Sequence, residues 1–204
     1  MSVGNNYSSI LVAAEAADVA EALASFAPTA FAKSAAAGRT AVGDEFFFGS
    51  EEVNEAAARL SRLSEIGAVA FWVYSSDALS AIAYRDGLPV HCYDSTADTL
   101  IARVIERDGR LQGDFENPYY LYEAGDPNWP SGVRGADPDW LLPFAAGAVD
   151  RDVLARLLDL RLIPDDKVVV RGDGSQRWLF ASEHHCAIAE ALHLDPAYLC
   201  GELD

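Results

Sequence analysis

Histidine and cysteine come together at one place in this 204-residue sequence, the run Ser182-Glu183-His184-His185-Cys186. Imidazole and thiolate groups bind zinc, and they also act as base and nucleophile in covalent catalysis. Zinc ligands on one helix need a spacing of three or four residues. Neither histidine has a histidine, cysteine or acid at that distance further along the chain. A metal site would need ligands from elsewhere, such as His91 and Cys92, and we predict no metal site.

A cysteine–histidine pair is the second chemical possibility. Cys92 with His184 or His185 would supply the thiol and the base of a small hydrolase. We expect Cys92, however, to lie beside Ala81 and Val90 on an apolar strand face, as a small buried hydrophobe. The chain has no Gly-x-Ser-x-Gly elbow, no phosphate loop and no dinucleotide fingerprint. The small hydrolase is therefore the alternative function, and we predict no catalytic residue and no cofactor.

Aromatic and acidic side chains alternate between residues 111 and 143, where Gly and Pro interrupt every regular element. An irregular stretch of this length inside a domain is usually functional or mobile. Tyr and Trp are enriched at interface cores, and acids around them attract a basic partner. The alternative is that these aromatic side chains cover an edge of the core. The predicted binding residues are Tyr119, Tyr120, Tyr122, Asp126, Trp129, Asp137, Asp139 and Trp140.

The charge balance narrows the class of partner. The chain carries 15 Lys and Arg against 32 Asp and Glu, a net charge of −17, and half of its residues are hydrophobic. This composition predicts a folded protein and argues against binding nucleic acid through its phosphate backbone. It favours a basic protein partner or mimicry of a polyanion, although an acidic surface also serves solubility alone.

The cysteines and the N-terminus indicate the compartment. Cys92, Cys186 and Cys200 are widely spaced and odd in number, which is typical of free thiols in a reducing environment. The N-terminus lacks the pattern of a signal peptide, and no apolar run approaches the ~20 residues of a membrane span. We therefore expect a cytoplasmic protein that does not enter a membrane. Its richness in Ala, Asp and Arg is typical of a GC-rich bacterial genome.

Residues 68–94 organise the expected fold. Two turn signals divide this apolar stretch into three runs, which predicts a three-stranded antiparallel meander. Its second turn, Asp86-Gly87, fits a two-residue type I′ hairpin loop, so Arg85 should pair with Leu88. Pro89 cannot donate a hydrogen bond, which makes the third strand an edge.

An uninterrupted register from this turn pairs Ala83 with Val90 and Ile82 with His91. Because side chains alternate along a strand, His91 and Cys92 would then lie on opposite faces. The two expected faces are Ile82, Tyr84, His91 and Tyr93, and Leu79, Ala81, Ala83, Val90 and Cys92.

The rest of the chain supplies further strands and helices. Asp150 is a plausible N-cap, and the helix after it should bury Val153, Leu154, Leu157 and Leu158. His185 should only border the buried face of the helix that Ser182 caps. We expect strands at 7–14, 45–48, 167–171 and 176–181, and helices at 15–26, 50–66, 98–107, 150–160 and 183–193. Residues 29–43 are ambiguous.

Together these elements predict an α+β fold, a mostly antiparallel sheet with a central three-stranded meander and helices packed on it. We expect one domain over residues 1–204, with a long irregular insertion at about 111–143.

Three pieces of the sequence resemble a family of bacterial α+β proteins of unknown function. They are the opening strand at 7–10, the meander with its Tyr84–Gly87 and Tyr93–Ser95 segments, and the closing 178–192 region. The pieces span about half of the chain and contain no catalytic motif, so the resemblance assigns no activity and no residue roles. In size and acidity the chain is also similar to immunity proteins of polymorphic toxin systems.

The sequence therefore predicts a non-enzymatic interaction module that binds a basic protein partner, of which an immunity-type protein is one form. The alternatives are the small hydrolase and a small-ligand sensor with a pocket under residues 111–143. An enzyme requires a histidine and a cysteine or acid to meet in a cleft. An interaction module requires a convex or flat, exposed acidic patch around residues 114–140.

Overall fold

The structure, a computed structural model, describes residues 6–44, 50–74, 78–95, 133–159, 168–170, 176–178 and 181–200. Its elements are β1 (Tyr7–Val12), α1 (Ala16–Leu23), β2 (Phe31–Ala36), β3 (Arg39–Gly43), α2 (Ser50–Leu60), the 3-10 helix η1 (Ser61–Leu63), β4 (Ala68–Tyr74), β5 (Ala78–Arg85), β6 (Leu88–Asp94), the 3-10 helices η2 (Pro138–Trp140) and η3 (Leu142–Phe144), α4 (Arg151–Leu158), β7 (Val168–Val170), β8 (Gln176–Trp178) and α5 (Ala181–Ala191).

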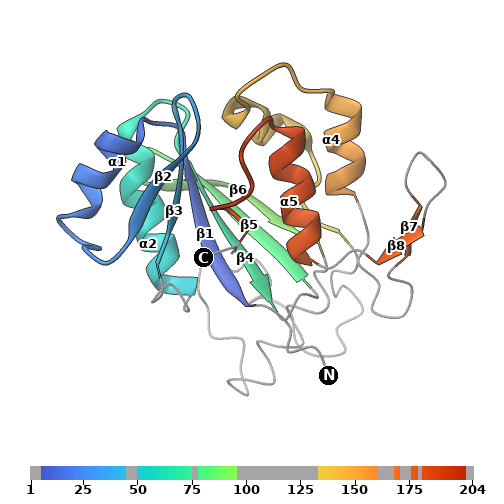
Figure 1. The fold of residues 1–204 in the computed structure, drawn as a ribbon, viewed down its shortest axis with the longest axis horizontal. Helices are drawn as coiled ribbons and strands as arrows, with labels where there is room; N and C mark the ends of the chain where they lie inside the picture. The colour runs from blue at the N-terminus through green and yellow to red at the C-terminus, as the bar shows by residue number, and fades with distance from the viewer. Residues whose placement is uncertain are drawn as a thin grey trace.

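Six strands form one antiparallel sheet in the order β2-β3-β1-β4-β5-β6, and helices pack on both of its faces (Figure 1). Strands β7 and β8 pair separately with each other. The predicted α+β class, with its central meander β4-β5-β6, is confirmed. Strand β6 ends the sheet, as Pro89 suggested.

The segment that the sequence left ambiguous is the hairpin β2-β3, with Gly38 at a φ of 66° in its turn. Its strands are rich in small residues, whose pattern of polarity is too weak to indicate a strand. The predicted strand at 45–48 and the predicted helix at 98–107 lie outside the described residues.

The hairpin β5-β6 begins as predicted and then changes register. Asp86 and Gly87 have φ values of 52° and 80°, as a type I′ turn requires, and Arg85 pairs with Leu88. One residue later a β-bulge interrupts the ladder, because Tyr84 pairs with Pro89 whereas Ala83 pairs with His91. The extra residue is Val90, which is 55 % exposed.

This bulge makes the predicted register wrong beyond the turn. Ala83 does not pair with Val90, and Ile82 pairs with Cys92 and not with His91. An unpaired residue shifts every later side chain to the other face. Cys92 therefore shares a face with Ile82, while Tyr93 joins the core on the opposite face.

Each face of the sheet has its own apolar core. On one face, which we call the α1/α2 layer, Val19 and Leu23 of α1 and a stripe on α2 pack on the sheet. The opposite face, the α4/α5 layer, is covered by α4, α5, η2, η3 and the chain after α5 (Figure 1). The near-continuous apolar runs of β4 and β5 follow from this cover, because both of their faces are buried. The α2 stripe consists of Val53, Ala56, Ala57 and Leu60.

Gly67 links the end of the α2–η1 segment to β4. Its φ is 103°, and a Cβ at this position would overlap the carbonyl oxygen of Tyr84. Both the backbone conformation and the close approach of β5 therefore require glycine. Glycine is therefore needed at this position for two independent reasons.

The helices of the other layer begin near their predicted positions. Asp150 caps α4, since its carboxylate accepts hydrogen bonds from the backbone N–H groups of Asp152 and Val153 at 3.0 and 3.1 Å. Leu154 and Leu158 are buried, but Val153 is 37 % exposed, so its predicted burial is wrong. The side chain of Val153 leaves the core because Leu154 and Leu158, one turn apart, form the stripe of α4 that faces inward.

Candidate functional site

The predicted aromatic and acidic binding site is described only in part. Tyr119, Tyr120, Tyr122, Asp126 and Trp129 lie outside the described residues. The other three members lie in η2 or directly before it, and the structure gives each a role within the fold.

Trp140 covers the edge of the core. Its ring stacks on His91 of β6 at a centroid distance of 4.8 Å and an interplanar angle of 16°. A second stacked contact, at 6.3 Å, joins it to the buried Tyr93. His91 in turn donates from Nε2 to the carbonyl oxygen of Gly135 at 2.9 Å. These contacts favour the alternative prediction, that Trp140 covers an edge of the core, over the prediction that it lies in an exposed interface.

Asp137 and Asp139 are exposed, but both are engaged locally. Asp137 accepts a hydrogen bond from the backbone N–H of Asp139 at 3.0 Å and so caps η2. Asp139 accepts from Nε of Arg151 at 2.8 Å, and Arg151 also lies 3.7 Å from Asp137. The hydrogen bond from Arg151 lowers the pKa of Asp139. Arg151 of α4 thus compensates part of the negative charge that we predicted to attract a basic partner.

His184 and His185 are both fully buried, so the prediction that His185 only borders the buried face is wrong. His184 donates from Nε2 to the carbonyl oxygen of Leu157 at 2.7 Å and ties α5 to α4. Nδ1 of His185 accepts from the hydroxyl of Tyr7 at 3.1 Å and ties α5 to β1. The second ring nitrogen of each histidine has no partner in the described part of the chain.

Burial sets the charge of both rings. Desolvation lowers the pKa of His184 to about 4, and desolvation together with His184 lowers the pKa of His185 to about 3. Burial also raises the pKa of the Tyr7 phenol, with Cys200 and Cys186 adding to the effect. The rings of Phe71 and Tyr7 lie 4.4 and 5.9 Å from His185. At neutral pH both imidazole rings are therefore uncharged, and both are closed off from solvent.

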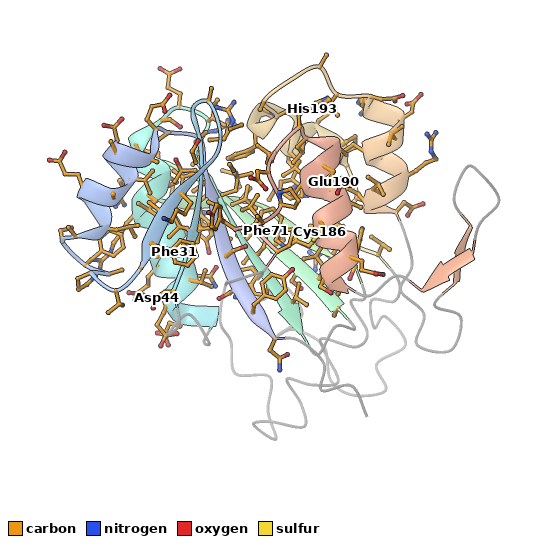
Figure 2. The ribbon with its side chains drawn as sticks, in the orientation of Figure 1. Phe31, Asp44, Phe71, Cys186, Glu190 and His193 are labelled. Carbon is orange, nitrogen blue, oxygen red and sulfur yellow. The ribbon has the colours of Figure 1, made fainter. Side chains whose placement is uncertain are left out.

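The structure does not bring Cys92 to these histidines. Cys92 packs in the α1/α2 layer, whereas His185 contacts Phe71 in the α4/α5 layer, so the sheet lies between them. Cys186 does lie on α5, at the position marked in Figure 2. No group of three metal-binding side chains occurs among the described residues. The pair that the hydrolase alternative needs is therefore not assembled.

A groove that we did not predict from the sequence opens in the α1/α2 layer. It has a volume of about 270 Å³ and lies between α2 and the connection from α1 to β2. Its walls combine apolar and charged side chains, and the guanidinium of Arg59 lies 5.0 Å from the centroid of the Phe26 ring. Figure 2 marks Asp44 on this side of the molecule. The lining residues are Phe26, Ala27, Pro28, Thr29, Asp44, Glu52, Glu55, Ala56 and Arg59.

The sequence carried one signal of this groove. Glu52, Glu55 and Arg59 are spaced by three and four residues, so they lie on one side of α2. Acids at the start of a helix are also explained as favourable charges near its positive end, so this spacing alone does not indicate a groove. The other wall comes from residues 26–29, and no local pattern connects those residues to α2.

The two helices of this layer carry a set of acids that we call the acidic helical face, of which Glu52 and Glu55 line the groove: Asp18, Glu21, Glu51, Glu52 and Glu55. All five are exposed, and none forms an ion pair with another described residue. Arg59 is the only base within the bounds of α1 and α2. This face therefore carries uncompensated negative charge.

No family model, no curated protein and no solved structure matches the chain. Within the described residues, no helix has the length and apolar character that a membrane span requires.

Proposed function

We propose that this chain is a non-enzymatic interaction module that binds a basic protein partner through the acidic helical face. The observation that carries the proposal is that the five exposed carboxylates of α1 and α2 have no ion-pair partner in the described part of the chain. Negative charge of this kind attracts a basic surface over several ångströms and speeds its encounter with the protein.

The histidine cluster supports a binding role over a catalytic one. A general base must reach the proton that it abstracts, and its pKa should be near the working pH. His184 and His185 are closed off from solvent, and burial lowers the pKa of each well below neutrality. Their hydrogen bonds join α5 to α4 and to β1, which is a structural role.

The immunity form of this proposal has a defined partner, a basic toxin domain encoded beside this chain in a bacterial genome. The acidity and size of the chain support this form, and the compartment would then be the cytoplasm. A neighbouring toxin gene would identify the partner directly.

Affinity capture from the native cell, followed by reconstitution with the purified partner, tests the proposal. We expect a basic protein that binds wild type and loses affinity as salt rises from 50 to 200 mM, because screening weakens surface attraction. A variant with Asp18, Glu21, Glu51, Glu52 and Glu55 changed to Asn or Gln should bind at least about tenfold more weakly.

The matched control is the double variant Asp137→Asn/Asp139→Asn, which removes two exposed acids that Arg151 already compensates. It should bind the partner as wild type does. A partner that is acidic, or that binds the five-site variant unchanged, would contradict the proposal.

A further inference from the structure

The groove in the α1/α2 layer is small for a free metabolite. Ligand pockets for small molecules usually enclose about 300 to 1,000 Å³ and bury most of the ligand. This groove encloses about 270 Å³ and lies open at the surface. Its size suits one long side chain that enters from a partner better than it suits a cofactor.

The negative charge of the groove favours a cationic ligand. The groove contains three carboxylates, those of Asp44, Glu52 and Glu55, against the single guanidinium of Arg59. Asp44 accepts a hydrogen bond from the hydroxyl of Thr29 at 2.7 Å. Glu52 and Glu55 have no ion-pair partner among the described residues, so their oxygens are available to an incoming donor.

The apolar part of the groove favours a guanidinium in particular. The ring of Phe26 already has the guanidinium of Arg59 at 5.0 Å from its centroid, which is a cation–π contact. Arginine can stack on an aromatic ring and also donate two parallel hydrogen bonds to a carboxylate, whereas lysine is a compact point charge. Ala27 and Pro28, which also line the groove and are not buried, offer an apolar surface for the aliphatic stem of the side chain.

We propose that this groove receives an arginine side chain from the basic partner, with Glu52 and Glu55 binding the guanidinium and Arg59 competing for the same place. This inference rests on the proposed function and adds to it the position and the residue type that the partner must supply. Arg59 then acts as an internal competitor, because its own guanidinium occupies the face of Phe26.

The probe is the capped tripeptide acetyl-Gly-Arg-Gly-amide, titrated into the full-length protein and followed through backbone NMR shifts. We expect saturable shifts centred on Glu52, Glu55 and Arg59. The same tripeptide with lysine should bind more weakly, and the one with uncharged citrulline should not bind. Equal responses to all three peptides, or shifts spread evenly over α1 and α2, would overturn the proposal.

Two pairs of variants separate the groove from general charge. Glu52→Gln/Glu55→Gln should raise the apparent Kd of the arginine tripeptide about tenfold. Its matched control, Asp18→Asn/Glu21→Gln, removes two exposed acids of the same layer that do not line the groove, and should change the Kd little. An equal loss in both double variants would overturn the proposal.

The second pair tests the competitor. Arg59→Gln should tighten binding of the arginine tripeptide, whereas Arg62→Gln, which removes an exposed base of η1 outside the groove, should tighten it much less. Equal tightening by both would overturn the role of Arg59.

The partner assay distinguishes the two proposals. If the purified partner binds, and Glu52→Gln/Glu55→Gln weakens its binding only as much as Asp18→Asn/Glu21→Gln does, the groove assignment fails. The proposed interaction function then still stands. If no basic protein binds at all, the interaction function fails, whatever the tripeptide does.

Discussion

The two helical layers of this protein use their polar residues in opposite ways. In the α1/α2 layer, apolar stripes face the sheet and the carboxylates face outward without ion-pair partners in the described chain. In the α4/α5 layer, His184 and His185 are buried, and their hydrogen bonds connect the helices to the rest of the core. The difference teaches that the residues with the most reactive chemistry serve the fold, while the common surface acids of α1 and α2 remain exposed without ion-pair partners in the described chain.

A second contrast lies among the acids themselves. Asp139 and Glu55 are both exposed carboxylates, yet Asp139 is bonded to Arg151 while Glu55 lines a groove without a compensating base bonded to it. Composition counts these two acids equally. Only their neighbours in space indicate which of them can contribute to binding.

The largest expected effect concerns acid pH and the α4/α5 layer. Each buried ring has a folded-state pKa below its ordinary 6.5, about 4 for His184 and about 3 for His185. Below pH 6.5 the unfolded chain therefore binds more protons, so the stability that the neutral rings maintain is complete above pH 6.5 and falls as the pH decreases toward 4 and 3. We expect each ring to lower the free energy of unfolding by on the order of 3 kcal/mol between pH 7 and pH 4. Urea unfolding at both pH values measures this loss.

The variant His185→Phe isolates this effect from that of the carboxylates. It retains a ring beside Phe71 and removes one titrating group, so its stability should fall less steeply between pH 6.5 and 4. His193→Gln, at an exposed position after α5, is the matched control for loss of a histidine and should keep the wild-type slope. The same slope in His185→Phe and wild type would contradict the assignment.

The next largest effect compares the apolar contacts of the two layers. Leu60 of α2 and Leu154 of α4 are 1 % and 0 % exposed. Truncating either to Ala should lower the free energy of unfolding by about 2 to 5 kcal/mol, because a buried leucine leaves a cavity when it is shortened. Denaturant unfolding of both variants checks this. A loss below about 1 kcal/mol at one site only would show that the layers are unequal in their contribution to stability.

A smaller effect is expected at the start of α4. Asp150→Ala removes the carboxylate that caps two backbone N–H groups, and should cost about 1 kcal/mol. In a chain of this size that loss corresponds to a decrease in Tm of ~2–4 °C. Asp150→Asn keeps a capping oxygen and should melt near the wild-type temperature; a Tm as low as that of the alanine variant would contradict the capping role.

The smallest effect sharpens the contrast between the two kinds of acid. Asp139→Asn breaks an exposed ion pair with Arg151, and such pairs contribute little to stability. We expect no measurable change in Tm and no change in partner binding. Glu55→Gln should likewise leave Tm unchanged but weaken binding of the partner. Equal binding by these two variants would remove the distinction between the two kinds of acid.

The sequence by itself determined the features that depend on near neighbours along the chain. Asp86-Gly87 specified a type I′ turn, because few residues accept positive φ at both positions, and the apolar runs on either side specified strands. Asp150 marked the start of α4. Together these local signals were sufficient for the α+β class and for the central meander.

The candidate site depended on contacts that no local pattern contains. The bulge at Val90 decided which face His91, Cys92 and Tyr93 occupy, since a single unpaired residue reverses an alternation that looks regular in the sequence. The burial of His184 depended on α4 and on Tyr93 of β6 lying against α5, and the groove required residues 26–29 to lie beside α2. Long-range packing decides burial and ion pairing. These in turn decide which polar groups form hydrogen bonds and ion pairs within the fold and which remain exposed without such partners.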